Sequence, residues 1–118
     1  MNILIIGGGG FVGRKVATQL AETGTLRGQT ITGLTLADIA EPAPIDAPFP
    51  ITCVACDITD RAQVDAMIGK EINVIFHFAA VVSSHAEADF DAGMQVNLFG
   101  TLNVLERCRA LGTCPVVV

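Results

Sequence analysis

Met1-Asn-Ile-Leu-Ile-Ile-Gly-Gly-Gly-Gly-Phe-Val-Gly13 opens the chain and decides its fold. Residues 2–6 form an apolar run of the length expected for a buried strand. Four glycines follow, and then Val12, Val16 and Leu20 recur at helical spacing. A helix that starts straight after a tight turn leaves backbone N–H groups without helical partners, and the helix dipole adds partial positive charge there. The stretch therefore predicts a strand, a turn and a helix that together bind an anion.

The glycines fit two spacings that are typical of dinucleotide-binding turns. Gly8, Gly10 and Gly13 match G-x-G-x-x-G, whereas Gly7, Gly10 and Gly13 match G-x-x-G-x-x-G. A side chain at Gly7 or Gly10 would keep a pyrophosphate away from the N–H groups, and one at Gly13 would push the helix off the strand. A turn without a ligand needs one or two glycines rather than five in seven positions. We therefore predict a dinucleotide site.

Composition limits the class of protein. The chain has 118 residues, enough for one domain, and its 51% hydrophobic and 16% charged content predicts a full core rather than disorder. The net charge is −5 without a basic cluster, which argues against nucleic acid as a partner. No apolar run reaches the ~18 residues of a membrane span, and the N-terminus lacks the basic region of a signal peptide. We expect a cytoplasmic protein without a membrane partner.

The cysteines are predicted to be free thiols. Cys53 and Cys56 form a C-x-x-C inside a strand-like run, where their odd spacing sends them to opposite faces. A redox C-x-x-C opens a helix instead, and no second ligand pair completes a zinc site, so we predict buried thiols and no metal. The chain closes on residues 115–118, which resemble the start of another buried strand. We expect residues 1–118 to be the N-terminal part of a longer protein.

Periodicity predicts the remaining elements. Helices are expected at about 10–23, ended by Gly24, through 63–68 after a cap at Thr59 or Asp60, and at 86–111. Strands are expected at 31–37, 51–56 and 72–78, with a polar link at 25–30 and a proline-rich loop at 39–50. The apolar side of the last helix is expected to carry its large residues, Phe90, Met94, Leu98, Leu102 and Leu105. Alternating strands and helices predict an α/β, Rossmann-type, doubly wound parallel sheet, truncated after the start of strand five.

Four polar residues near the predicted strand ends carry functional interpretations. Asp38 ends the second strand, where an acidic residue accepts hydrogen bonds from ribose hydroxyls. Because no arginine or lysine follows before Arg61, we expect NAD rather than NADP, the alternative being a capping or loop carboxylate. His77 and His85 flank the turn after the fourth strand without a Ser or Asp partner, so a structural or rim role is favoured. Asn97 is expected to point inward, either as a satisfied core amide or, as we favour, near the site.

Five ordered motifs give the chain a family resemblance. They are Gly7-x-x-Gly10-x-x-Gly13, Asp38, Asp57-Ile58-Thr59, His77-Phe-Ala-Ala80 and Asn97-Leu-Phe-Gly-Thr101. Over essentially its whole length the chain resembles the extended short-chain dehydrogenases, the NAD-dependent epimerase/dehydratase group. Residues 79–90 are most similar to the sugar-acid dehydrogenases of that group, of the D-erythronate dehydrogenase type.

The resemblance implies a role for each motif, with NAD as the cofactor. Gly7, Gly10, Phe11, Val12 and Gly13 would hold the pyrophosphate. Asp38 would bind the adenosine ribose, Asp57 and Ile58 would flank the adenine, and Phe78, Ala79 and Ala80 would line the nicotinamide side. Asn97 would support the cofactor or the hydrogen bonds of the active site. The resemblance further implies hydride transfer on a sugar acid or related carbohydrate, and a homodimer formed through the helix at 86–111.

The chain departs from that family in one respect. The proton transfer of these enzymes uses a Tyr-x-x-x-Lys pair, but this sequence has no tyrosine, and its lysines, Lys15 and Lys70, lie in other motifs. We therefore expect no catalytic residue within 1–118 and no activity from this segment alone. Three alternatives remain open: a sugar-nucleotide epimerase or dehydratase, a non-catalytic dinucleotide-binding module, and a flavoprotein that uses the Gly8 spacing.

Overall fold

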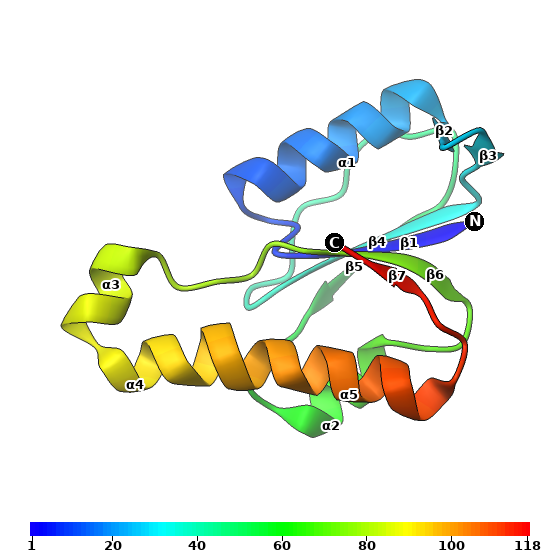
Figure 1. Ribbon diagram of the computed structural model, residues 1–118. Helices are drawn as coiled ribbons and strands as arrows, with labels where there is room; N and C mark the ends of the chain where they lie inside the picture. The colour runs from blue at the N-terminus through cyan, green and yellow to red at the C-terminus, as the bar shows by residue number, and fades with distance from the viewer.

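A single parallel sheet forms the centre of the molecule in the computed structural model, which describes all 118 residues (Figure 1). Its five strands lie in the order β5-β4-β1-β6-β7. They are β1 (Asn2–Ile6), β4 (Gly33–Asp38), β5 (Ile51–Ala55), β6 (Ile72–His77) and β7 (Val116–Val117). The strands that follow β1 in the chain, β4 and β5, lie on one side of it, whereas β6 and β7 lie on its other side. At the carboxyl ends of β1 and β6 the connecting segments therefore lead away from each other. The predicted doubly wound sheet is confirmed.

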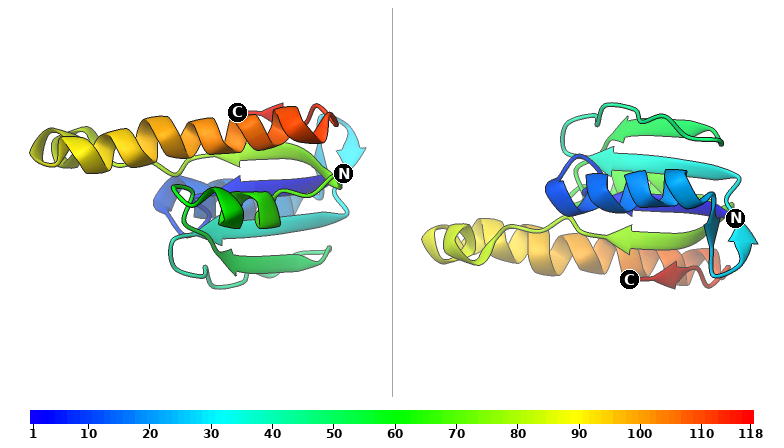
Figure 2. Two further views of the ribbon diagram at one scale, coloured as in Figure 1. Left: turned by 90° about the horizontal axis from the view of Figure 1, so that it is seen from below. Right: turned by 90° about the horizontal axis from the view of Figure 1, so that it is seen from above.

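Helices cover the two faces of the sheet. Helix α1 (Phe11–Thr23) lies on one face, and α2 (Arg61–Met67) and α5 (Thr101–Leu111) lie on the other (Figures 1 and 2). Helix α1 ends as predicted at Gly24, which adopts a left-handed φ of 67° and donates its N–H to the Leu20 carbonyl. None of the helices is both long enough and apolar enough to cross a lipid bilayer.

Strand alternation builds two cores from one run of apolar residues. Ile3 and Ile5 point toward α1, whereas Leu4 and Ile6 point toward α2 and α5. All four side chains are at most 1% exposed, and burying one of them stabilises the fold by about 1.5–3 kcal/mol. The C-x-x-C pair follows the same rule: Cys53 packs in the first core and Cys56 in the second. Both thiols are free as predicted, but Cys53 is only partly buried.

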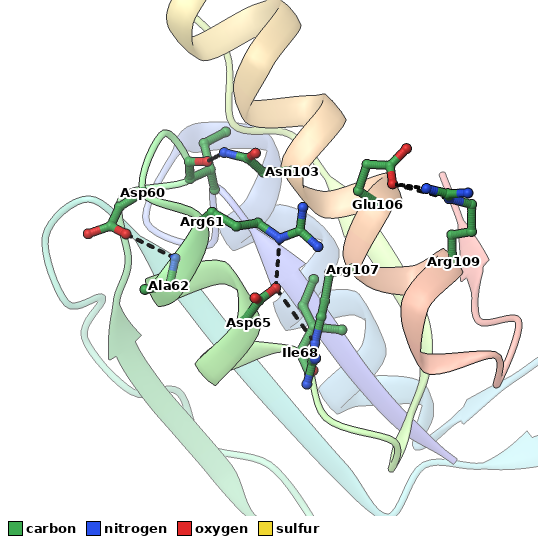
Figure 3. A network of polar contacts seen from close by, with 10 residues as sticks. Asp60, Arg61, Ala62, Asp65, Ile68, Asn103, Glu106, Arg107 and Arg109 are labelled. Carbon is green, nitrogen blue, oxygen red and sulfur yellow. Dashed lines mark hydrogen bonds and ion pairs between the residues drawn. The ribbon is translucent and has the colours of Figure 1, made fainter.

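Polar side chains on α5 fasten α2 beneath the sheet (Figure 3). Asn103 donates its side-chain N–H to the Ile58 carbonyl at 2.9 Å, before α2, and Arg107 donates Nε–H to the Ile68 carbonyl at 2.9 Å, after it. Asp60, one of the two predicted caps, accepts the Ala62 N–H at 3.0 Å. The loop that precedes α2 is thereby held in a fixed position relative to the end of β5.

The single helix predicted at 86–111 is wrong in its first part. The chain instead forms α3 (Ser83–Ala88), α4 (Phe90–Gly93) and a π-helical segment η1 (Met94–Gly100) that continues into α5. Asp89 causes the break, because its backbone leaves the helical region at φ −134° and its carboxylate accepts the Ala92 N–H to start α4. Apolar periodicity alone does not reveal such a new cap.

The predicted apolar side of that helix is also wrong. The large residues expected to be buried are mostly exposed, with Leu98, Leu102 and Leu105 each 46–49% accessible. The buried side instead carries Gly93, Gly100 and Val104. A Cβ at Gly100 would lie 2.7 Å from Ile58 in the loop before α2, and one at Gly93 would lie 2.8 Å from Ala86 of α3, so the smallest residues allow close packing at these two contacts.

The link predicted at 25–30 is a β-hairpin. Strands β2 (Thr25–Leu26) and β3 (Gln29–Thr30) pair antiparallel around Arg27 and Gly28. Both central residues have positive φ, 50° and 79°, as a type I′ turn requires. An arginine in the first of these positions gives no hairpin signal in the sequence, and the second large strand therefore begins at Gly33 rather than at residue 31.

Candidate functional site

A cleft of about 420 Å3 opens at the carboxyl ends of the strands, where the strand order reverses. Four strand ends and the π-helical segment contribute to its wall. The lining residues are Ile6, Gly7, Gly10, Asp38, Ile39, Cys56, Asp57, Ile58, Phe78, Ala79, Ala80, Val81 and Val96. Eight of the twelve residues predicted from the sequence to bind a cofactor thus meet around one space, although they come from four separate parts of the chain.

The turn after β1 shows which glycine spacing is used. Gly7 has φ 89°, and a Cβ on it would lie 2.8 Å from the Ala79 nitrogen. The backbone that follows β6 therefore requires glycine at position 7, and Gly7 also lines the cleft, where the sequence predicted the close approach of a ligand. Gly8 packs against Leu36 of β4, outside the cleft lining, whereas Gly10 lines the cleft. The spacing Gly7, Gly10, Gly13 describes this turn.

Gly13 holds the helix against the turn, as predicted. A Cβ at Gly13 would overlap the Gly7 carbonyl oxygen and come within 3.0 Å of the Gly8 Cα. Both atoms are backbone, so neither can move aside as a flexible side chain would. The absence of a side chain at Gly13 therefore sets the distance between α1 and β1 and directs the N-terminus of α1 toward the cleft.

Three backbone amides at that N-terminus have no acceptor in the protein. The N–H groups of residues 7–10 are all satisfied, by Ala37, Asp38 and Gly7 oxygens. Those of residues 11–13 are not, because no side chain caps the helix. The Phe11 and Val12 side chains are 77% and 53% exposed, and these residues directly follow Gly10, which lines the cleft. An anion bound at the N-terminus of α1 would supply the hydrogen-bond acceptors that the amides of residues 11–13 lack.

Asp38 lines the same cleft at the end of β4. Its Oδ2 accepts the Gly9 N–H at 3.0 Å, and its Oδ1 accepts the Ile39 N–H at 2.8 Å. It caps no helix, so the capping part of the alternative is wrong, whereas its bonds to Gly9 and Ile39 agree with the loop-carboxylate part. Each oxygen keeps a further lone pair, and the residue is only half-buried. The arrangement leaves acceptors for two hydroxyl groups of a ligand.

The wall beyond Asp38 is less polar. Asp57 Oδ1 accepts both the N–H and the hydroxyl of Thr59, at 3.0 and 2.7 Å. Ile58 is 5% exposed, and Cys56 lies beside it. Burial, reinforced by the carboxylates of Asp57 and Asp60, raises the pKa of the Cys56 thiol. This thiol is therefore a neutral apolar surface at pH 7, suited to the face of a flat ring rather than to nucleophilic chemistry.

Asn97 holds the opposite wall in place. Its Oδ1 accepts the Val81 N–H at 2.7 Å, and its Nδ2 donates to the Val81 carbonyl at 2.9 Å. The residue does not point into the core as predicted, since it is exposed and lies behind the loop that carries Ala79 and Ala80. It sits in the π-helical segment, an irregularity that is frequent at functional sites. Both backbone polar groups of Val81 are thereby fixed by one side chain.

The two histidines have different surroundings. His77 Nε2 lies 2.8 Å from the Thr101 hydroxyl, which ties the end of β6 to the start of α5. Its Nδ1 is buried without a partner, and burial lowers the pKa of the ring. His85 is exposed on α3. His77 therefore acts in the structure as a neutral spacer between sheet and helix, which agrees with the structural role favoured from the sequence.

These features define the class of the domain: a Rossmann-type fold with a glycine turn, an open helix N-terminus and an acidic residue ending the next strand of the sheet. Residues 4–118 match the 3-beta hydroxysteroid dehydrogenase/isomerase family, and the chain belongs to that family of NAD-dependent dehydrogenases and epimerases. The predicted resemblance to the extended short-chain dehydrogenases is confirmed.

Individual relatives point in the same direction. D-erythronate dehydrogenase from Cupriavidus necator is 44% identical over all of this chain and 37% of its own length. The solved structure of a nucleoside-diphosphate-sugar epimerase from Agrobacterium tumefaciens is 36% identical, with a TM-score of 0.92 over 99% of this chain and 36% of that one. A mutant uronate dehydrogenase from the same organism, solved with NAD, is 28% identical, with a TM-score of 0.74 over 92% and 36%. The chain thus spans little more than a third of the length of these relatives.

One charged residue beside the site was missed by the sequence reasoning. Arg14 lies on α1 next to Gly10 and Asp38, and its guanidinium donates to the Ala43 carbonyl. Arg14 precedes Asp38 in the sequence, whereas the prediction of a site without a nearby cation rested on the residues that follow Asp38. The helical spacing places Arg14 one turn after Gly10, where it faces the proline-rich loop, and this would have been the signal to use.

Proposed function

We propose that this chain binds NAD in the cleft and supplies the cofactor-binding part of an NAD-dependent oxidoreductase that acts on a sugar acid or related carbohydrate. The observation that carries the proposal is the set of three unpartnered amides, at residues 11–13, which follow the glycine turn that Asp38 binds through the Gly9 N–H. A pyrophosphate on those amides and a ribose diol on the carboxylate would satisfy both groups at once. NAD supplies the hydride acceptor for oxidation of a carbinol.

The other predicted residues receive roles from their positions. Asp57 and Ile58 would flank the adenine, because they form the less polar wall beyond Asp38. Residues 78–80 would line the nicotinamide, since they directly follow β6, lie beside Gly7 and line the cleft. Asn97 would act as a positioning residue through its two hydrogen bonds to Val81.

Titration of NADH with the 118-residue chain tests this proposal directly. The chain contains no tryptophan or tyrosine, so nicotinamide fluorescence can be followed without interference from the protein. We expect saturable enhancement that ADP-ribose reverses and that FAD does not. Failure of NADH to bind a folded chain, shown by circular dichroism, would contradict the proposal, and preferential binding of FAD would support the flavoprotein alternative.

The chemical step requires groups that this chain does not contain. Positioned acid–base catalysis contributes roughly 10²–10⁴-fold, and no tyrosine is present to provide it. Cys56 is a neutral thiol, and His77 is bonded to Thr101. We propose that residues 1–118 bind NAD without turnover, as the N-terminal portion of a longer enzyme. Assay of NADH formation over sugar acids and sugar nucleotides tests this, and turnover that disappears in His77→Ala or His85→Ala would make a histidine the base.

The relatives favour two reactions over the remaining alternatives. Similarity to D-erythronate and uronate dehydrogenases supports oxidation of a sugar acid, which we prefer because of the 44% identity to the former. The TM-score of 0.92 to a nucleoside-diphosphate-sugar epimerase supports the second candidate, epimerisation of a sugar nucleotide. Net NADH accumulation during turnover by a chain that carries the catalytic pair would favour the first reaction, whereas product formed without net NADH would favour the second.

The exposed apolar side of η1 and α5 supports a homodimer of the full-length protein. Leu98, Leu102 and Leu105 follow one another at helical spacing and are nearly half accessible, and Phe99 beside them is 44% exposed. Such a stripe is suited to a second copy of the same helix, because an isologous contact buries the same apolar surface of both subunits against each other. A cytoplasmic location stays a prediction from composition. Light scattering that shows a monomer at micromolar concentration would contradict the dimer.

A further inference from the structure

The cleft wall at Ile58 is held from behind by helix α5. The Ile58 side chain is 5% exposed and lines the cleft, whereas its carbonyl oxygen accepts the side-chain N–H of Asn103 at 2.9 Å (Figure 3). Asn103 is half-buried and does not line the cleft. Asn103 therefore contacts the wall without reaching the space in which a ligand would bind.

The helix also contacts the apolar part of Ile58. A Cβ at Gly100, directly before α5, would lie 2.7 Å from the Ile58 Cδ1, so this side chain packs on the helix backbone. The residues on either side of Ile58 are held by other groups. Asp57 donates its N–H to Gln63 Oε1 at 2.9 Å, and Thr59 donates its N–H and hydroxyl to the Asp57 carboxylate. The Ile58 peptide is thus the part of this wall that α5 fixes.

The same continuous helix holds the opposite wall of the cleft. In η1, Asn97 bonds to both backbone polar groups of Val81. At the start of α5, the Thr101 hydroxyl lies 2.8 Å from His77 Nε2 at the end of β6. The two walls therefore take their positions from one helix, but through different side chains, so each wall can be perturbed separately.

We infer that Asn103 is a positioning residue for the adenine side of the cleft. The inference rests on the proposed function, in which Ile58 flanks the adenine. Without the Asn103 donor the Ile58 carbonyl loses its partner, and a polar group without a partner favours conformations in which it reaches water. Turning this peptide toward water moves the attached side chain away from the face of the adenine. The nicotinamide side keeps its own tethers, Asn97 and Thr101.

Arg107 provides a matched control on the same helix. It lies about one turn after Asn103 and donates Nε–H to the Ile68 carbonyl at 2.9 Å, so it makes the same kind of bond to the other end of α2. Neither Arg107 nor Ile68 lines the cleft. Arg107 Nε also lies 3.9 Å from Asp65 Oδ1, so its removal disturbs the contact between α2 and α5 at least as much. A loss of affinity specific to Asn103 therefore reports on the cleft wall.

Competition against NADH fluorescence measures the two ends of the cleft separately, with ADP as the probe of the adenosine end and nicotinamide mononucleotide as the probe of the other end. We expect Asn103→Ala to weaken ADP binding by about 2–10-fold, the range that corresponds to one hydrogen bond. Its affinity for nicotinamide mononucleotide should stay within about twofold of wild type. Asn103→Asp, which has the same size but no N–H donor, should show the same difference between the two probes. Arg107→Ala should leave both affinities within about twofold.

A double-mutant cycle tests whether Asn103 acts through Ile58. Ile58→Ala removes the side chain that would contact the adenine, so adding Asn103→Ala to it should weaken ADP binding by less than about twofold. An undiminished effect of Asn103→Ala in this background would show that Asn103 acts on another part of the site, which contradicts the inference.

The outcomes separate the two proposals. If the wild-type chain binds neither NADH nor ADP, the proposed function and this inference both fail. If it binds them but the two Asn103 variants bind ADP as wild type does, or weaken both probes equally, the inference alone is wrong. Thermal unfolding shows which variants are folded. Unfolding of both Asn103 variants under conditions in which Arg107→Ala is folded would assign the bond to the fold as a whole and would also overturn the inference.

Discussion

Gly10→Ala and Gly13→Ala are predicted to have different effects: the first should weaken cofactor binding, and the second should lower the stability of the fold. At Gly10 a Cβ would touch only the Gly7 oxygen, at 3.4 Å, and the backbone there, φ −79° and ψ 172°, suits any residue. Alanine at a compatible position stabilises by about 0.4–1 kcal/mol through the unfolded state. Alanine is a poorer N-cap than glycine, so these terms nearly cancel. The free energy of unfolding of Gly10→Ala should stay within about 1 kcal/mol of wild type.

The same methyl group should nevertheless weaken cofactor binding. It projects at the mouth of the cleft, beside the unpartnered amides of residues 11–13. A hydrogen bond to a charged group contributes about 1.5–3 kcal/mol, so holding the pyrophosphate away from one amide should raise the Kd for NADH by about 10–150-fold. Nicotinamide fluorescence measures the affinity, and urea unfolding measures the stability of the same preparation.

Gly13→Ala provides the contrast. Its Cβ would overlap the Gly7 carbonyl oxygen, and backbone cannot rotate away, so we expect a loss of about 3 kcal/mol or more and a fall in Tm on the order of 10 °C. The reasoning is refuted if Gly10→Ala binds NADH as wild type does, since the pyrophosphate would then lie elsewhere. It is equally refuted if Gly10→Ala unfolds as readily as Gly13→Ala, because the two glycines would then share one structural role.

Three further predictions concern the ends of the strands and the exposed helix. Burial lowers the pKa of His77 below the ~6.5 of an unfolded chain, so the unfolded state binds the proton first and the free energy of unfolding should fall as pH is lowered from 7 to 5; urea midpoints should show a flatter profile for His77→Gln and an unchanged one for the exposed His85→Gln. Gly7→Ala combines a positive φ with a collision against the backbone at the end of β6, whereas Gly28→Ala has a positive φ and open space around it. Thermal unfolding should show that Gly28→Ala lowers the free energy of unfolding by about 1–2 kcal/mol and that Gly7→Ala lowers it by at least about 1 kcal/mol more. Leu102→Glu places a charge in the exposed apolar stripe, so any self-association seen by light scattering should fall without a loss of Tm, and a variant that unfolds instead would show that this side chain is needed by the fold.

Apolar runs and glycines were sufficient to predict the sheet and its turn. Residues 2–6 are apolar on both faces because both faces are covered, and this is visible without knowing what covers them. The ends of the strands then followed from Asp38 and Asp57, and parallel connectivity brings all such ends to one edge. The site could be predicted from the sequence to that extent, as a set of strand ends rather than as measured contacts.

The features that the sequence did not predict depend on which elements pack against each other in the folded chain. The helix at 94–111 is apolar on two sides, and only the short distance to Ile58 decides that the glycine side is buried. The break at Asp89 depends on one side chain that caps a new helix inside an apparently continuous pattern. Arg14 and Asp38 are 24 positions apart in the sequence and line the same hollow only because the chain folds. Sequence spacing contains none of these distances, which explains why the sheet was predicted better than the helix packing.

The position of β1 at the centre of the sheet constrains the order in which the chain can fold during synthesis. Ile3 pairs with Leu34 on one side and with Val74 on the other, so β1 receives its second neighbour only after residues 7–71 have been synthesised. Until then β1 can pair only within a sheet of β5, β4 and β1, which leaves the other edge of β1 unpaired. Such long-range parallel pairing is slow and leaves edges open to other chains. Ribosome-bound chains that end before Ile72 should therefore recruit chaperones, and chains that extend past His77 should become resistant to protease.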